Sequence, residues 1–155
     1  MSDSYEIVFQ QVAAGDLYEL LESIGVDSQI FSELAVSEEV AGGRLAGEAR
    51  NLIDEIIAYG GDICLTAQLH GFRISEEICL PLVLLRVIKY RGWVDVELSF
   101  NDPLSFDIGN IMLAAQRYAD FLSNRYHVEE FYGGLEPAAD TNTRYFTGNA
   151  LGPLK

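Results

Sequence analysis

The chain has 155 residues, of which 49% are hydrophobic and 22% charged, and its formal net charge is −14. This composition fits one globular domain with a hydrophobic core and excludes a disordered chain. The acidic balance argues against nucleic-acid binding, which needs a basic surface, and no apolar run is long enough to span a membrane. We therefore expect neither nucleic acid nor a membrane as a partner.

Charge is distributed unevenly along the chain. The first 43 residues contain no Lys or Arg, and the first basic residue is Arg44. Nine acids occupy this stretch: Asp3, Glu6, Asp16, Glu19, Glu22, Asp27, Glu33, Glu38 and Glu39. Because ordinary surfaces mix both signs, this pattern predicts a folded acidic surface that attracts basic partners.

The first elements follow from residue type and spacing. Residues 5–10 are rich in β-formers and predict a strand. Leucine and isoleucine recur at helical spacing between Asp16 and Gly25, which predicts a helix. Phe31 and Leu34 indicate a short helical turn, and the apolar residues from Leu45 to Ile56 predict a second helix.

The middle of the chain predicts a hairpin followed by a helix. Residues 63–70 alternate in polarity and should form a half-buried strand. A turn at residues 71–72 would return the chain as a second strand, which sets Cys64 opposite Cys79. A proline suits the first turn of a helix, and we predict such a helix over residues 81–91.

The last third of the chain begins with the clearest strand. Residues 93–100 alternate, so the even positions should face the core and the odd positions, starting with Trp93, the other side. A turn at 101–103 and a long helix over 108–122 follow. From Glu129 onward the pattern fails, and we expect an irregular segment, rich in glycine and aromatic residues, packed on the body.

These elements predict a single α+β domain over residues 1–155, with a mostly antiparallel sheet and helices packed on one face. The stretch Met1–Ser4 lacks the basic and apolar regions of a signal peptide. Two cysteines do not make a disulfide framework. We therefore expect a cytoplasmic location.

No motif for nucleophilic catalysis or phosphate binding occurs, and the two histidines, His70 and His127, lack metal-ligand spacing. We accordingly predict no catalytic residue, no metal and no cofactor, and thus a protein that is not an enzyme. Asp95, Glu97 and Asp102 leave one alternative open, because carboxylates on one strand face bind Mg²⁺ in many hydrolases.

Protein recognition is the favoured function on the residues alone. An indole beside carboxylates on one strand face is a suitable composition for binding an Arg- or Lys-rich partner. Two glutamates share the exposed side of the first helix, and two more lie beyond it as steering charges. The predicted partner-binding residues are Glu19, Glu22, Glu38, Glu39, Trp93, Asp95 and Glu97.

One stretch starts at Gly61-Asp62-Ile63-Cys64-Leu65, continues through Leu80 and Leu84-Leu85, and ends at Trp93-Val94-Asp95-Val96-Glu97-Leu98-Ser99. This stretch resembles part of the immunity proteins encoded beside bacterial polymorphic toxins. This resemblance implies a small cytoplasmic protein that binds and neutralises a cognate toxin domain. An acidic inhibitor suits a basic, nuclease-type toxin. A non-catalytic adaptor subunit is a further alternative.

Overall fold

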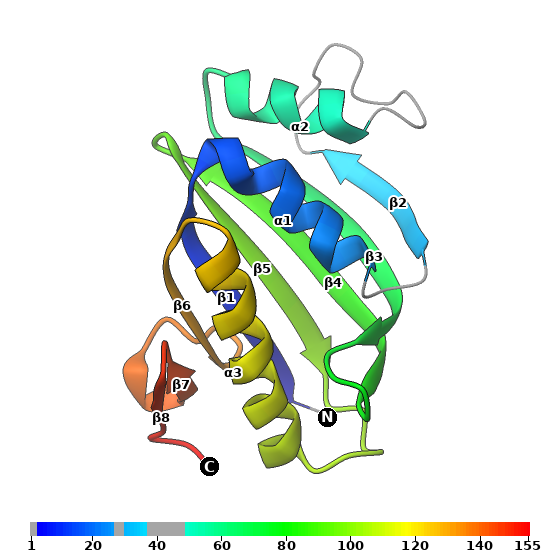
Figure 1. Cartoon of the computed structure of the whole chain (residues 1–155), viewed down its shortest axis with the longest axis vertical. Helices are drawn as coiled ribbons and strands as arrows, with labels where there is room; N and C mark the ends of the chain where they lie inside the picture. Colours follow the sequence, from blue (N-terminus) through cyan, green and yellow to red (C-terminus); the bar gives the residue numbers. More distant parts are fainter. Residues whose placement is uncertain (1–2, 27–29, 37–48) are drawn as a thin grey trace.

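The computed structural model describes residues 3–26, 30–36 and 49–155. Within these ranges the chain forms an eight-stranded sheet and three α-helices (Figure 1), with strand order β2-β3-β4-β5-β1-β6-β7-β8. The strands are β1 (Ser4–Val12), β2 (Ile30–Val36), β3 (Ile63–Arg73), β4 (Cys79–Tyr90), β5 (Trp93–Asn101), β6 (Val128–Leu135), β7 (Arg144–Thr147) and β8 (Ala150–Leu151). The helices are α1 (Ala14–Val26), α2 (Ala49–Ala58) and α3 (Ile108–Arg125). The strand pairings between described residues are antiparallel, so the predicted α+β fold is confirmed.

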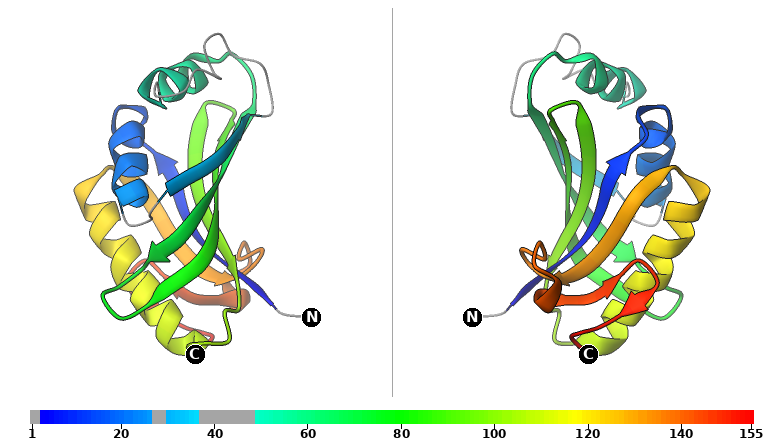
Figure 2. Two further views of the ribbon diagram at one scale, coloured as in Figure 1. Left: turned by 90° about the vertical axis from the view of Figure 1, so that its right-hand side faces the viewer. Right: turned by 90° about the vertical axis from the view of Figure 1, so that its left-hand side faces the viewer.

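Helices α1 and α3 lie on one face of the curved sheet, and α2 lies across one of its ends (Figure 2). The core lies between these layers. Leu17, Leu20 and Ile24 of α1 belong to the same fully buried cluster as Phe9 and Val96 of the sheet. Each such side chain contributes roughly 1.5–3 kcal/mol by burial. We call this side of the molecule the helix side, and the opposite face of the sheet the outer face.

The first strand lies inside the sheet, between β5 and β6. β1 pairs with β5 on one side, with Tyr5 opposite Phe100, and with β6 on the other, with Tyr5 opposite Leu135. The turn between β6 and β7 includes the short 3₁₀ helix η1 (Thr141–Thr143) and lies over the outer face (Figure 2). The sequence predicted the strand over 5–10 and the alternating strand over 93–100, and both are confirmed.

The long hairpin of β3 and β4 differs from the prediction. β3 continues to Arg73, and the turn lies at 74–78 instead of 71–72. The segment from Cys79 to Tyr90 is a strand, so the helix predicted over 81–91 is wrong. In the observed register Cys64 is opposite Ile88, and Cys79 is opposite Arg73.

The apolar run of β4 fits a strand because of its neighbours. Leu80, Val83, Leu85 and Val87 are buried on the helix side; all four positions pair with β3, and the last two also pair with β5. Pro81 is tolerated because pairing with β5 begins only at Leu84, so the missing N–H interrupts no bond to that strand.

Two further expectations concern the region before β3. β2 covers the residues for which we predicted a short helical turn, and it pairs with β3, with Phe31 opposite Leu69. That prediction is wrong. The second helix is confirmed as α2 from Ala49 onward, whereas its predicted start at Leu45 lies outside the described residues.

The C-terminal segment is more regular than the sequence suggested. The expected irregular stretch from Glu129 contains β6, β7 and β8. Phe146 of β7 is fully buried in the core, and Gly134 of β6 lies directly against the backbone of Thr143. The segment therefore extends the sheet and also supplies core.

Candidate partner-binding surfaces

Trp93 lies at the tip of the β4–β5 hairpin and is 50% exposed. The hairpin turn has two central residues, Arg91 and Gly92, with φ of 50° and 82°. A two-residue turn with both φ values positive matches the right-handed twist of the strands. Gly92 therefore lies in a hairpin turn, whereas we predicted that it ends a helix. The indole projects on the outer face, as the alternation predicted.

Asp95 is on the same face but is only 7% exposed. Its Oδ1 accepts a hydrogen bond from the backbone N–H of Gln11 at 2.9 Å, and its Oδ2 accepts one from the Tyr90 hydroxyl at 3.1 Å. Gln11 has a positive φ of 53°, so the carboxylate holds a bend near the end of β1. Asp95 thus fixes the hairpin that carries Trp93.

Glu97 takes part in a polar cluster on the outer face. Arg86 of β4 lies between two carboxylates: its Nε is 3.3 Å from Glu97 Oε1, and its Nη2 donates to Glu136 Oε2 at 2.6 Å. Both carboxylates and the guanidinium are about three-quarters covered. The β6–β7 turn thereby becomes attached to the centre of the sheet.

Glu6 of β1 completes this cluster and is only 5% exposed. Its Oε2 accepts a hydrogen bond from Ala138 N at 2.6 Å, and Arg144 Nε donates to Ala138 O at 2.8 Å. The Arg144 guanidinium lies 3.8 Å from the ring centre of Tyr132, and burial raises the pKa of Tyr132 to about 12. The β6–β7 turn thus covers the part of the outer face around Glu6 and Arg86.

These carboxyls predict a pH dependence of stability. Burial raises the pKa of Glu6 and of Glu97, the latter also through the Glu6 charge. When the pKa of a carboxyl is raised in the folded state, its ionisation lowers the free energy of unfolding. This loss is complete above the raised pKa and absent below the ordinary value of 4.5. The free energy of unfolding should therefore rise as the pH falls from neutral toward 4.5. Urea unfolding at about pH 7 and about pH 5.5 measures this change.

The variant Glu6→Gln should flatten that pH dependence, since a glutamine oxygen can still accept the Ala138 bond but does not ionise. Glu19→Gln, at an exposed site, is the matched control and should leave the slope as in the wild type. An equal slope in all three proteins would contradict the role assigned to Glu6.

The predicted contacts on α1 lie on the other side of the molecule. Glu19 and Glu22 are exposed on the helix side, and Tyr18 Oη donates to Glu22 Oε2 at 3.1 Å. Asp95 and Glu97 face the outer side, so the structure does not bring the two predicted groups together. Glu38 and Glu39 lie outside the described residues.

The carboxylates of the Mg²⁺ alternative are engaged within the fold. Asp95 and Glu97 hold the contacts given above, and Asp102 Oδ1 accepts a bond from Leu104 N at 2.9 Å. Among the described residues there is no group of three or more His, Cys, Asp or Glu side chains that could hold a metal ion.

The two cysteines are also separated. Cys64 and Cys79 do not form a disulfide, and they lie nine register positions apart along the hairpin, about 30 Å at the rise of a strand. Burial raises the pKa of the Cys64 thiol, which disfavours the reactive thiolate. The expectation that these residues face each other was wrong.

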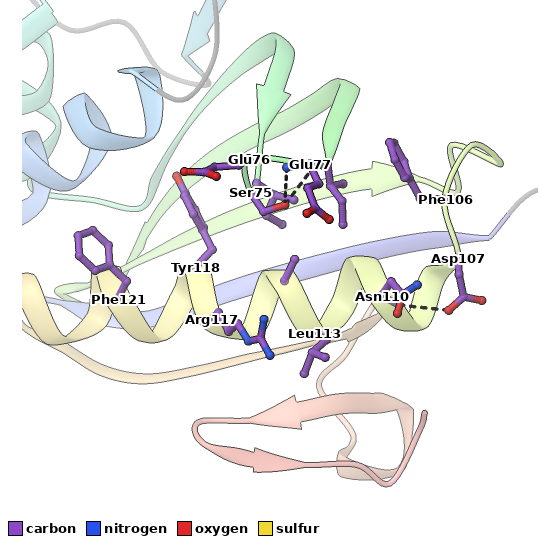
Figure 3. Close-up of a pocket in the computed structure, with 13 residues that line it drawn as sticks. Ser75, Glu76, Glu77, Phe106, Asp107, Asn110, Leu113, Arg117, Tyr118 and Phe121 are labelled. Carbon is purple, nitrogen blue, oxygen red and sulfur yellow. Dashed lines mark hydrogen bonds between the residues drawn. The ribbon is translucent and has the colours of Figure 1, made fainter.

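A groove that the sequence did not predict lies on the helix side. It is bounded by the exposed side of α3 and by the β3–β4 turn (Figure 3), and its volume is about 740 Å³. We call it the α3 groove. Its lining includes Ile74, Ser75, Glu76, Glu77, Ile78, Phe106, Asp107, Asn110, Leu113, Ala114, Arg117, Tyr118 and Phe121.

A signal for this groove was present in the sequence. The core stripe of α3 contains Ile111, Ala115 and Leu122, whereas Leu113 and Phe121 lie off that stripe. Large apolar residues on the polar side of an amphipathic helix point to a second contact surface. The other wall could not be predicted, because we placed the hairpin turn at residues 71–72.

An acidic α+β fold with exposed apolar side chains beside carboxylates is typical of the protein-binding class of small domains. Its sequence matches the model of the PABL017 Cdi1I immunity protein family over residues 3–151. The chain therefore belongs to this family of immunity proteins, which confirms the resemblance noted from the sequence.

One solved structure is similar over its full length. It is a chain of the 1.75 Å crystal structure of the toxic C-terminal tip of CdiA from Pseudomonas aeruginosa in complex with immune protein. The TM-score is 0.93 and the identity 37%, with 100% of both chains covered. No curated protein matches the sequence. Among the described residues, no helix is both long and apolar enough to cross a membrane.

Proposed function

We propose that this chain binds the C-terminal toxin domain of a CdiA-type protein and neutralises it stoichiometrically in the cytoplasm, without catalysis. The family match over residues 3–151 carries the proposal. It is supported by the similar chain, which comes from a crystal structure of a toxic CdiA tip in complex with immune protein.

The charge of the chain favours a basic toxin. The net charge is −14, and only three ion pairs join described residues. Exposed carboxylates such as Glu19, Glu22, Glu76 and Glu77 are available to a cationic surface, which would speed association. A nuclease-type toxin fits, because an enzyme that acts on nucleic acid needs a cationic substrate cleft.

Growth and binding measurements test this function. The probe is the purified C-terminal tip of the CdiA-type protein from the same genome. Cells that produce this tip should stop growing and should recover when the chain is co-produced. The purified proteins should form a 1:1 complex, and added chain should abolish cleavage of RNA or DNA by the tip. Continued arrest with soluble chain present would refute the proposal.

Of the predicted contacts, Glu19 and Glu22 are the accessible carboxylates of α1. Replacing both with Lys should slow association with the tip about tenfold at low salt, because long-range attraction becomes repulsion. Added salt should shrink this difference. Association rates at two salt concentrations measure the effect.

The matched control for that variant is Asp3→Lys with Asp140→Lys, which makes the same change in net charge at two exposed residues away from α1. This control should slow association less than the replacement of Glu19 and Glu22 does. Equal rates for the two double variants would show that net charge, and not the face carrying Glu19 and Glu22, determines the attraction.

A further inference from the structure

We propose that the α3 groove is the docking site for the toxin, and that it receives an apolar side chain of the toxin flanked by Lys or Arg. This inference deepens the proposed function and rests on it.

The groove concentrates exposed apolar surface. Seven large hydrophobic side chains are exposed among the described residues, and three of them line the groove: Phe121 at 61%, Leu113 at 38% and Phe106 at 36%. Leu113 and Phe121 are eight residues apart on α3, about two turns of the helix. Apolar surface gathered in this way marks a contact site.

The opposite wall carries unpaired negative charge. Glu76 and Glu77 of the β3–β4 turn are exposed, and neither forms an ion pair with another described residue. Figure 3 shows these two glutamates across the groove from α3, which carries Arg117 and Phe121. Apolar surface beside free carboxylates is complementary to an apolar anchor with basic neighbours.

The walls are ordered without a partner. Ser75 Oγ accepts hydrogen bonds from Glu77 N at 3.3 Å and Ile78 N at 3.1 Å, and Arg73 Nη1 donates to Glu76 O at 3.0 Å. Asp107 Oδ2 caps α3 by accepting from Asn110 N at 3.2 Å. A preformed groove loses little conformational entropy on binding, which favours affinity.

The groove also lies on the same side of the sheet as the exposed glutamates of α1, Glu19 and Glu22. α1 and α3 share one face of the sheet (Figure 2), so one partner can approach the exposed glutamates of α1 and contact the groove. Trp93 lies on the outer face. The toxin that is attracted by α1 would thus be anchored by α3 and not by Trp93.

The test compares variants of the full chain for binding to the purified toxin tip. Phe121→Arg should raise Kd at least about 30-fold, mainly through faster dissociation, as expected of a hot spot. Glu76→Lys with Glu77→Lys should slow association about tenfold at low salt. Leu151→Arg, at a residue 66% exposed on β8, is the control for a new arginine, and Asp3→Lys with Asp140→Lys controls for charge. Both controls should bind more tightly than the groove variants.

The outcomes separate the two proposals. A wild-type chain that does not bind the tip removes the proposed function and this inference with it. Wild-type binding together with wild-type Kd for Phe121→Arg overturns the groove alone, and loss of binding in Trp93→Ala would then assign the contact to the outer face. A wild-type dimer in light scattering that Phe121→Arg converts to monomer would assign the groove to a second copy of the chain, which also overturns the inference. Thermal melts confirm that each variant is folded.

Discussion

Replacing Phe146 by Ala should lower the free energy of unfolding by about 3–5 kcal/mol, the usual cost of deleting a buried aromatic ring. Phe146 is 0% exposed, and its ring centre lies 6.2 Å from that of Phe131. Its backbone pairs with Gly133 of β6, so the ring joins the late strand β7 to the main core. Urea unfolding of both proteins at neutral pH measures the loss.

Phe121→Ala is the matched control, because it makes the same change at a residue that is 61% exposed. Exposed substitutions of this kind usually change stability by no more than about 0.5 kcal/mol. If the two variants were equally stable, the C-terminal segment would not contribute to the core in the way described.

Gly134→Ala should also destabilise the protein strongly, through a clash and not a cavity. A Cβ at this position would lie 2.2 Å from Thr143 O and 2.7 Å from Arg144 Cα. Both are backbone atoms, so no side chain can rotate away, and β7 would have to separate from β6. We expect a loss of about 1–3 kcal/mol or more, measured by the same urea unfolding.

The control for this variant is Gly60→Ala, where a Cβ would meet no atom within 4 Å. A compatible Gly→Ala change stabilises by about 0.4–1 kcal/mol, because it restricts the unfolded chain. A Gly134→Ala protein as stable as Gly60→Ala would contradict the close approach of β7 to β6.

Both substitutions should also affect the polar cluster on the outer face. The segment that contains Gly134 and Phe146 also carries Glu136 and Arg144, which close the polar cluster over β1, β4 and β5. Weakening this segment should expose Glu6 and Glu97 to water and reduce the pH dependence of stability. The α3 groove should keep its shape, because its walls are held by separate hydrogen bonds.

The sequence alone determined the features that depend on local pattern. The alternation in 93–100 predicted β5, and the leucine spacing predicted α1, because the side chains that face the core recur with the period of the element. Composition determined the acidity, and a pattern over residues 61–99 was enough to suggest the family.

The candidate partner-binding surfaces were harder to predict from the sequence. The alternation predicted the face of Trp93 but not its exposure of 50%. Asp95 is buried because Tyr90 of the same hairpin and Gln11, far away in the chain, both donate hydrogen bonds to it. The α3 groove needed the true position of the β3–β4 turn, which places Glu76 across from Phe121.

Only the tertiary structure decided the elements whose partners are distant. The apolar run of β4 is compatible with a buried helix or a strand, and pairing with both β3 and β5 selects the strand. Gly133 and Gly134 suggested a break in the chain, yet they lie inside β6, where a side chain would collide with β7. β6 exists because β1, more than 100 residues earlier, offers its edge for pairing. Such long-range hydrogen bonding leaves no periodic signal in the local sequence, and here it determines the centre of the sheet.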